Sequence, residues 1–553
     1  MVLPVDNYKL MRSFFLFLAI LFSLSCKTEK ADFDFIIRDG IIYDGSGNNP
    51  FKADIGINSD TIAFIGKLSN AIAKNEIDAR GLAVTPGFIN MLSWADGSLL
   101  KDGRSMSDIK QGVTLEVFGE GWSPGPRLRK TNDTTWGTLG EYFKYLEKKK
   151  VSTNFASFVG ATTVRDYVLG RENKKPSAKE LNEMKLLVKT AMEEGAMGLG
   201  SSLIYAPADY ASTEELVELC KVAASYRGMY ISHIRNESDK IYTALNEAFK
   251  ISKDANIPTE IYHLKINNTW NWSKIDTVIK KIDSAQKSGL RITADMYTYN
   301  ASGTGLTARL PTWVQEGGIA ATCKRLKNPA TRKKVIHELE LGIPSKNSNP
   351  KDVMVLGFRK DSLNDLYKGK RLSEISALHG KNSNETMLDL IIADRSSVPS
   401  IFFLISEDNL KRMLRLPYVS ICSDAGSIPN EKPFTDGGIH PRTYGSFSRL
   451  LGKYVREEKI LTLQEAIRRM SSLPASNLKI KKRGSLKIGH YADIVIFDPT
   501  KIKDNATYEN PHQYATGVEH VLVNGTQVLK SGEHTNAKPG RCIRGPGFVE
   551  RKK

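Results

Sequence analysis

The sequence has little cysteine and no long hydrophobic run. Five cysteines occur in 553 residues and none forms a CxxC pair, which excludes a zinc ribbon and a dense disulfide scaffold. The longest apolar run, Phe14–Phe22, is too short to span a bilayer, so a polytopic membrane protein is excluded. With 41% hydrophobic and 25% charged residues, the composition is that of an ordinary globular protein with more than one structural unit.

Acidic residues are outnumbered by basic ones. The chain has 79 Lys and Arg against 61 Asp and Glu, a net charge of +18. The basic residues are nevertheless spread along the whole chain, and the densest cluster, Lys481–Arg483, is short. No zinc-finger spacing or RNA-binding glycine-aromatic motif accompanies them. We therefore predict a solvated basic surface and no nucleic-acid partner.

The N-terminus has the layout of an export signal. A basic start at Met11–Ser13 precedes the apolar run Phe14–Phe22, and Ser25 stands just before Cys26. Residues 1–26 resemble a bacterial lipoprotein signal, although Ser23 replaces the usual Leu. The resemblance implies lipid on Cys26, membrane contact only through that lipid, and a place in the periplasm or outer membrane. The alternative is an ordinary cleaved signal in which Cys26 is incidental.

Both ends of the mature chain are predicted to form one small β-sandwich. Asp39-Gly40 and Asp44-Gly45 separate short apolar runs near the start, as hairpin turns do. The same texture returns late, in residues 492–498 and 521–528. Because chain termini often lie close together, residues 27–84 and 476–545 are expected to share one β-module.

Residues 85–475 alternate apolar runs with amphipathic helical stretches, which predicts an α/β fold with a parallel sheet. Eight such runs favour a closed (βα)8 TIM-type barrel over an open doubly wound sheet, since no GxGxxG follows the first run. The unusually long last gap predicts an insertion at about 303–400. The expected strands are Val84–Asn90, Val113–Glu120, Asn154–Gly160, Ala196–Ser201, Met229–His233, Glu260–Lys265, Arg291–Tyr297 and Tyr418–Asp424.

Polar residues at the predicted strand ends carry the chemistry, because catalytic side chains of such barrels project from the carboxyl ends of the strands. Glu120, His233, His263 and Asp424 stand there. The two histidines are 30 residues apart, about one strand-helix repeat, so both should point into one mouth. A lone histidine is usually a core residue, but two in register beside carboxylates favour a zinc site with a position open to water.

Several motifs give the chain a family resemblance. It resembles the N-acyl-D-amino-acid deacylase (D-aminoacylase) branch of the amidohydrolase superfamily. The resemblance implies that His233 and His263 bind zinc, that Asp424 is the general acid/base, and that Lys265, Tyr297 and Arg442 hold the substrate. The matching stretches are Val84–Asn90, Gly195–Pro207, Ser232–Glu237, His263–Lys265, Asp295–Tyr299, Ser423–Gly426, His440–Gly445 and Tyr491–Asp498.

The chain also departs from that family. Leu92-Ser93-Trp94 stands where the family's first strand ends in His-x-His, and neither Leu nor Trp binds zinc. After the second strand, relatives use a cysteine ligand that is absent here, and Glu120 lies one position earlier. A carboxylate is an ordinary zinc ligand, so we predict Glu120 as the third. The alternative is that Glu120 contacts the substrate or supports a ligand.

The resemblance predicts a zinc-dependent hydrolase that cleaves a linear amide, an N-acyl-D-amino acid. The N-terminal segment adds the prediction that it is exported, and Leu92 and Trp94 in place of the His pair predict one Zn²⁺ ion. Retention of His233, His263, Lys265, Asp424 and Arg442 favours an active enzyme. Two alternatives stay open at this point. One is another amidohydrolase, such as a cyclic amidase or dipeptidase, because a fold does not fix a substrate. The other is a lipid-anchored binding protein on an inactivated barrel.

Overall fold

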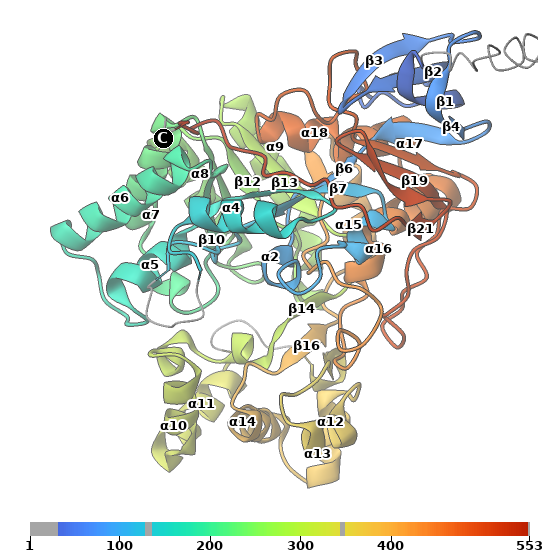
Figure 1. Cartoon of the computed structure of the whole chain (residues 1–553). Helices are drawn as coiled ribbons and strands as arrows, with labels where there is room; N and C mark the ends of the chain where they lie inside the picture. Colours follow the sequence, from blue (N-terminus) through green and yellow to red (C-terminus); the bar gives the residue numbers. More distant parts are fainter. Residues whose placement is uncertain (1–30, 128–134, 343–348, 551–553) are drawn as a thin grey trace, which may run out of the picture.

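The computed structural model describes residues 31–127, 135–342 and 349–550. The proposed signal and Cys26 therefore lie outside the described residues. Figure 1 shows three parts: a β-module at the top right, a central barrel, and a mainly helical insertion below it. In the described part of the chain, no helix is both long enough and apolar enough to cross a membrane.

The β-module is a nine-stranded sheet built from both chain ends. The strands from the two chain ends meet where β5 (Ala83–Pro86) pairs antiparallel with β18 (Ile494–Phe497), and Val84 lies opposite Ile496. Apolar residues of the strands from both chain ends, including Ile37, Ile55 and Ile494, form one buried core. The strands are β1 (Phe33–Ile42), β2 (Phe51–Asn58), β3 (Thr61–Gly66), β4 (Ala73–Asp78), β5 (Ala83–Pro86), β18 (Ile494–Phe497), β19 (Val518–Val523), β20 (Thr526–Lys530) and β21 (Glu533–His534).

The barrel consists of eight parallel strands, with β8 and β9 forming the third in two pieces. The amide of Met91 donates to Ile421 O (3.4 Å), and Ser93 bridges Ala425, so the first and last strands adjoin. The strands are β6 (Phe88–Asn90), β7 (Val113–Phe118), β8 (Asn154–Ser157), β9 (Val159–Gly160), β10 (Gly198–Ser202), β11 (Met229–His233), β12 (Thr259–Ile261), β13 (Ile292–Met296) and β17 (Val419–Ile421).

Amphipathic helices connect the barrel strands and bury their apolar faces. Two of them begin with a capping box, at Thr138 and at Ser177, where a side chain satisfies backbone N–H groups. The helices are α2 (Ala95–Ser98), α3 (Met106–Ile109), α4 (Leu139–Lys149), α5 (Ala161–Leu169), α6 (Ala178–Glu193), α7 (Thr213–Ser225), α8 (Ile241–Asp254), α9 (Ile275–Lys287), α15 (Glu407–Leu414), α16 (Arg442–Arg449), α17 (Leu463–Met470) and α18 (Ser472–Asn477).

The insertion has a core of its own, which includes Leu326, Val335 and Ile375. It leaves the barrel after β13, so it lies at the carboxyl ends of the strands (Figure 1). Its elements are β14 (Ser302–Gly305), α10 (Ile319–Lys327), α11 (Pro329–Glu340), β15 (Val353–Val355), α12 (Asp361–Tyr367), α13 (Leu372–His379), α14 (Ser383–Asp394) and β16 (Pro399–Phe402).

Two predicted strands differ from the observed ones in an informative way. The first is divided at Gly87 into β5 of the module and β6 of the barrel. Glycine is required at this point, because a Cβ would lie 2.0 Å from Thr114 Oγ1. The sixth ends at Ile261 instead of Lys265. Its continuation turns because the amide of His263 donates to Asp295 Oδ1 (2.8 Å) rather than to a neighbouring strand.

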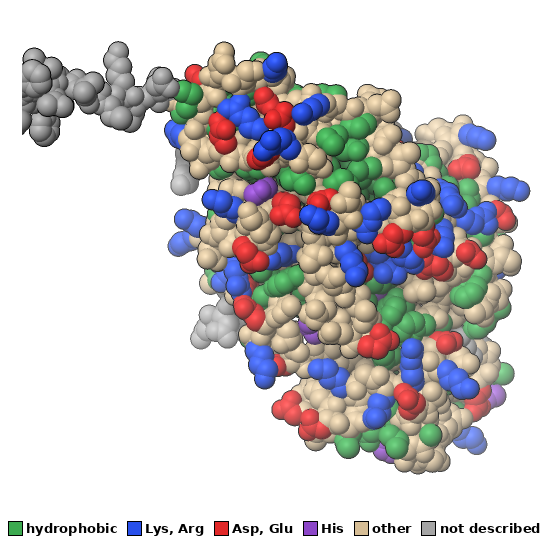
Figure 2. Space-filling model, turned by 90° about the vertical axis from the view of Figure 1, so that its right-hand side faces the viewer, with side chains coloured by type: hydrophobic (Ala, Val, Ile, Leu, Met, Phe, Trp, Pro, Cys, Tyr) green, Lys and Arg blue, Asp and Glu red, His purple; other side chains and the backbone are tan. Residues whose placement is uncertain are grey.

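Basic side chains do not gather in one patch on the face shown in Figure 2. Lys and Arg are interspersed there with Asp and Glu over the whole face. This mixing agrees with the even spread of basic residues along the sequence.

Candidate functional site

Three buried side chains meet at the carboxyl ends of barrel strands. Glu120 follows β7, His233 ends β11, and His263 lies just beyond β12. Gly119 (φ 110°) and Gly121 (φ 72°) flank Glu120 in backbone conformations that side chains rarely allow. A Cβ at Gly119 would lie 2.6 Å from Phe158 O, so this tight turn requires glycine and directs Glu120 inward.

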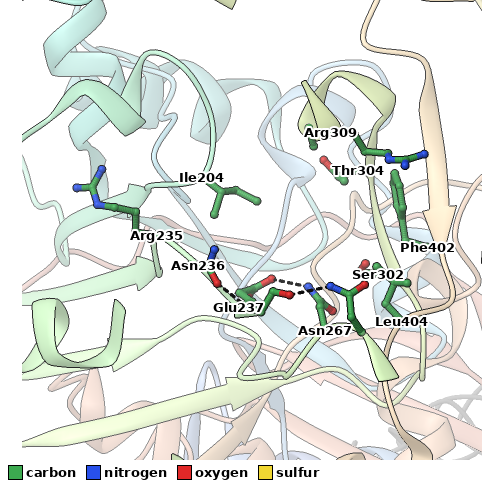
Figure 3. A pocket seen from close by; sticks show the side chains of 13 residues that line it. Ile204, Arg235, Asn236, Glu237, Asn267, Ser302, Thr304, Arg309, Phe402 and Leu404 are labelled. Atoms are coloured by element: carbon green, nitrogen blue, oxygen red, sulfur yellow. Dashed lines mark hydrogen bonds between the residues drawn. The ribbon is translucent and has the colours of Figure 1, made fainter. Parts of the chain in front are cut away.

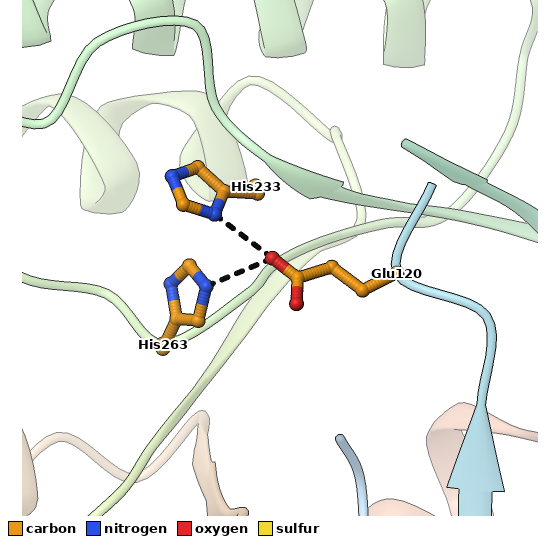
Figure 4. A group of neighbouring side chains, drawn as sticks. All are labelled: Glu120, His233 and His263. Carbon is orange, nitrogen blue, oxygen red and sulfur yellow. Dashed lines mark hydrogen bonds and ion pairs between the residues drawn. The ribbon is translucent and has the colours of Figure 1, made fainter. Parts of the chain in front are cut away.

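One carboxylate oxygen of Glu120 faces both imidazoles (Figure 4). Its Oε1 is 2.8 Å from His233 Nδ1 and 3.1 Å from His263 Nε2. The two rings are nearly perpendicular, with an interplanar angle of 85° and centroids 4.4 Å apart. Each of the three residues offers one ligand atom to a common point, with these atoms within 4.8 Å of one another.

This donor set suits a zinc ion. Two imidazole nitrogens and a carboxylate oxygen are the ligands of many catalytic zinc sites, and they leave a fourth position for water or substrate. Tetrahedral zinc with bonds of about 2.0–2.1 Å places its ligand atoms about 3.3 Å apart. The two contacts to Glu120 are within about half an ångström of that spacing, so small shifts would admit the ion.

A second carboxylate, Glu237, lies on the other side of the histidines. Its Oε1 is 3.2 Å from His263 Nδ1, and its Oε2 is 3.6 Å from His233 Nε2. Lys265 Nζ donates to Glu237 Oε1 at 2.6 Å. A carboxylate on the non-ligating nitrogen fixes the orientation of a metal-binding histidine. Sequence reasoning missed Glu237 as a site residue, although it ends the matched stretch Ser232–Glu237 and stands four residues after His233.

Two carboxylates of the site have cationic side chains as partners. Glu237 pairs with Lys265, and Asp424 pairs with Arg442 (Nη1 to Oδ2, 2.8 Å). Glu120 pairs with no Lys or Arg among the described residues, and its ion-pair partners are the two histidines. A cation shared by Glu120, His233 and His263 would therefore compensate the charge of Glu120.

The pKa directions agree with this charge arrangement. Burial opposes ionisation of Glu120, but hydrogen bonds from His233 and His263 outweigh it and lower the pKa of Glu120 to about 2. Burial and Lys265 oppose a charge on His263, yet the hydrogen bonds to Glu120 and Glu237 raise its pKa to about 10. Burial lowers the pKa of His233. Without a metal, a proton shared with His263 compensates Glu120.

Lys265 is engaged inside the site. Its Nζ is close to Glu237 Oε1, to His263 Nδ1 (2.8 Å) and to His263 O (3.3 Å). Two of the three N–H donors of the ammonium group are thus used, on Glu237 Oε1 and His263 O. The structure thus gives Lys265 a place behind the histidines, and its predicted contact with substrate stays a prediction.

Arg442 and Tyr297 present unused donors. Arg442 begins α16, and its guanidinium lies 4.7 Å from the Tyr297 ring. Within the described residues, Arg442 Nε and Nη1 and the Tyr297 hydroxyl are buried yet form no hydrogen bond. The Arg442–Asp424 contact is an ion pair without hydrogen-bond geometry. Buried polar groups normally find partners, so these atoms are placed to receive an anionic or polar ligand.

Two further side chains border the site. The Trp94 indole donates to Asp424 Oδ1 (3.1 Å), which places Trp94 beside the predicted acid/base. Tyr205, in the loop after β10, packs its ring edge-on against His233 (centroids 5.5 Å) and its hydroxyl hydrogen-bonds Thr304 of the insertion (2.9 Å). Tyr205 was not identified from sequence, where only the surrounding stretch Gly195–Pro207 was matched.

A pocket opens next to the histidines, between barrel and insertion (Figure 3). Glu237 and Asn267 line it from the barrel side, joined by a hydrogen bond of 3.2 Å. Thr304 and Phe402 line it from β14 and β16 of the insertion. Because Glu237 belongs to both, the pocket extends the site around His233 and His263.

Comparison with known proteins places this geometry in a family. Residues 75–529 match the family model described as "Amidohydrolase family". The chain belongs to the amidohydrolase family. It is 30% identical over 524 residues to N-acyl-D-glutamate deacylase of Alcaligenes xylosoxydans xylosoxydans, covering 92% of this chain and 96% of the relative. D-aminoacylase of the same organism is 29% identical over 529 residues, covering 94% and 99%.

Solved amidohydrolase structures agree with the fold. A D-aminoacylase structure superposes with a TM-score of 0.77 at 28% identity, covering 93% of this chain and 100% of that one. N-acyl-D-glutamate deacylase from Bordetella bronchiseptica, solved with zinc and a phosphonate inhibitor that mimics the tetrahedral intermediate, gives a TM-score of 0.78 at 29% identity, covering 93% and 99%. The predicted family and barrel are confirmed.

We expect zinc to depend on the three converging residues. His263→Ala and Glu120→Ala should each lower zinc affinity by more than about a hundredfold, because loss of merely supporting groups costs ten- to a hundredfold. Asp424→Asn is the matched control and should keep the metal, since Asp424 lies with Trp94 and Arg442 instead. The zinc content of each variant, measured after dialysis against a zinc buffer, tests this ligand set. Full occupancy in Glu120→Ala would remove Glu120 from the ligand set.

Proposed function

We propose that this protein is a zinc-dependent hydrolase that removes the acyl group from N-acyl-D-amino acids. The observation that carries the proposal is the convergence, at one barrel mouth, of a zinc-binding triad, a carboxylate and unused guanidinium and phenol donors. Relatives named for N-acyl-D-glutamate and D-amino-acid deacylation support it over more than nine tenths of the chain.

Different side chains of the site bind the metal, transfer the proton and hold the substrate. A bound zinc ion lowers the pKa of water towards neutrality and polarises a carbonyl. Glu120, His233 and His263 would hold that ion, and Glu237 orients the histidines from behind. Asp424 first accepts the proton of the attacking water and then donates it to the nitrogen of the leaving amine. Arg442 and Tyr297 receive the substrate carboxylate, which positions the amide beside Asp424.

We infer that the site holds one zinc ion. A related D-aminoacylase, 28% identical to this chain, is described as having a binuclear metal centre with one-metal activation and second-metal attenuation. In this chain, Leu92 and Trp94 offer no ligand at the end of the first strand. Asp424 is already paired with Arg442. Among the described residues, Glu120, His233 and His263 are the one cluster of three or more ligating residues.

The purified protein should hydrolyse N-acyl-D-amino acids and lose that activity on treatment with a chelator. Release of free amino acid from matched panels of D- and L-acyl amino acids gives the configuration and the preferred side chain. Readdition of zinc to the chelated protein should restore turnover, which separates metal loss from unfolding. Equal or faster turnover of the L panel, or of cyclic amides, would contradict the proposal.

Arg442→Lys should weaken recognition of the substrate carboxylate. Arginine offers a planar fork that matches a carboxylate, and lysine cannot reproduce it. The loss of a hydrogen bond to a charged group is worth roughly 1.5–3 kcal/mol, about ten- to a hundredfold in kcat/KM. The control is an N-acyl amine without a carboxylate, whose hydrolysis should be much less affected. An equal loss for both substrates would show that Arg442 acts through Asp424 alone.

We propose that the protein is exported and held at a membrane by lipid on Cys26. Support comes from the basic start, apolar run and cysteine in Met11–Cys26. Cys26→Ala should block signal processing and move the protein from the membrane fraction to the soluble fraction, since two or more acyl chains give stable anchoring. Cys542→Ala, at a half-buried cysteine of the folded part, is the control. Unchanged fractionation together with unchanged signal processing of Cys26→Ala would contradict lipidation.

A further inference from the structure

Both oxygens of Asp424 are held by neighbouring side chains. Trp94 Nε1 donates to Oδ1 at 3.1 Å, and Arg442 Nη1 lies 2.8 Å from Oδ2. In the described part of the chain, Trp94 is the one residue that donates a hydrogen bond to this carboxylate. The orientation of Asp424 therefore depends on one hydrogen bond and one ion pair.

The backbone fixes Trp94 and Asp424 relative to each other. The amide of Trp94 donates to Ala425 O (2.9 Å), and the amide of Asp424 donates to Leu92 O (2.9 Å). These bonds join the extensions of the first and eighth barrel strands. Asp424 has a φ of 49°, in the left-handed region that few side-chain-bearing residues adopt. Contacts on both sides hold it there, and Trp94 supplies one of them.

We propose that Trp94 is a positioning residue that keeps Asp424 aimed at the reacting amide while Arg442 binds the substrate carboxylate. The inference rests on the proposed function, in which Asp424 carries the proton. A substrate carboxylate at Arg442 competes with Asp424 for the same guanidinium. The Trp94 indole is not part of that competition, so its hydrogen bond retains the orientation of Asp424 in the substrate complex.

An indole suits this task better than the histidine expected from the family. Indole Nε1 is a donor only, whereas a histidine nitrogen acts as donor or acceptor according to its protonation. Indole also has no lone pair with which to bind a metal. The chain thus places a constant donor beside the proton carrier, at the position where the family resemblance leads one to expect a zinc ligand.

Trp94→Phe tests the proposal, because it keeps an aromatic ring and removes the N–H donor. We expect kcat to fall about tenfold, the size of a lost hydrogen bond to a charged group, with KM unchanged within about twofold. Trp313→Phe is the matched control. It removes an indole that donates to Glu338 Oε2 (2.9 Å) in the insertion, and kcat should not change.

A double-mutant cycle separates positioning from a structural role. If Trp94 acts through Asp424, Trp94→Phe should cost nothing further in an Asp424→Asn background. Independent, additive losses in the double variant would overturn the proposal. So would an unchanged kcat in Trp94→Phe protein that retains its zinc and its melting temperature.

A spectroscopic measurement tests the same contact without turnover. Among the indole N–H resonances of the six tryptophans, the one missing from Trp94→Phe identifies Trp94. Asp424→Asn should shift that resonance in otherwise native protein, because a charged acceptor becomes neutral, and an unmoved resonance would overturn the contact. If Trp94→Phe fails to fold, Asp424→Asn still tests the contact. One indole N–H resonance should then shift, and a spectrum with no shifted indole resonance would overturn the proposal. Absence of acyl-amino-acid hydrolysis in the wild type would count against the proposed function alone.

Discussion

The contact of Glu120 with two buried histidines is the interaction on which the rest of the site depends. A buried carboxylate is costly unless a positive charge compensates it. Glu237 and Asp424 have fixed partners in Lys265 and Arg442, whereas the ion-pair partners of Glu120 among the described residues are His233 and His263. A proton or a metal ion shared by these three residues therefore compensates the charge of Glu120. Metal binding by Glu120, His233 and His263 therefore also depends on the pairs Glu237–Lys265 and Asp424–Arg442, which leave Glu120 without a Lys or Arg partner among the described residues.

The barrel supplies that arrangement through irregular segments beyond its strands. Glu120 and Asp424 lie past the observed ends of β7 and β17, and His263 lies past the end of β12. His263 (φ 33°) and Asp424 (φ 49°) both have left-handed backbones, which turn their side chains out of the strand alternation. Strain of this kind persists where the surrounding structure fixes it, as the bond from the His263 amide to Asp295 does. Regular strands give the rigid frame, and the turned residues give the site.

The barrel strands and the contact between His233 and His263 can be predicted from the sequence. Buried strands appear as apolar runs, and the strand-helix repeat sets the spacing of the two histidines. The eight apolar runs each overlap an observed barrel strand, and His233 and His263 meet as their spacing predicts. What periodicity does not encode is the pairing of charges. Glu237 binds Lys265, and Arg442 contacts Asp424, through turns whose direction depends on local dihedral angles and distant partners. The left-handed turn at His263 likewise leaves no mark in the hydrophobic pattern, so the predicted sixth strand is too long.

Leu92, Ser93 and Trp94, which stand where the family's first strand ends in His-x-His, each make a different contact. Leu92 is fully buried and belongs to the barrel core. Ser93 donates to the buried Glu116 at 2.8 Å, and Trp94 donates to Asp424. The segment thus contributes packing, a hydrogen bond to a deep carboxylate and a hydrogen bond to the proposed proton carrier. A second cation near Asp424 would meet no ligand here and would be repelled by Arg442, 2.8 Å from the same carboxylate. In place of the two histidines expected from the family, this segment therefore gives Asp424 an indole donor, which holds the carboxylate together with Arg442.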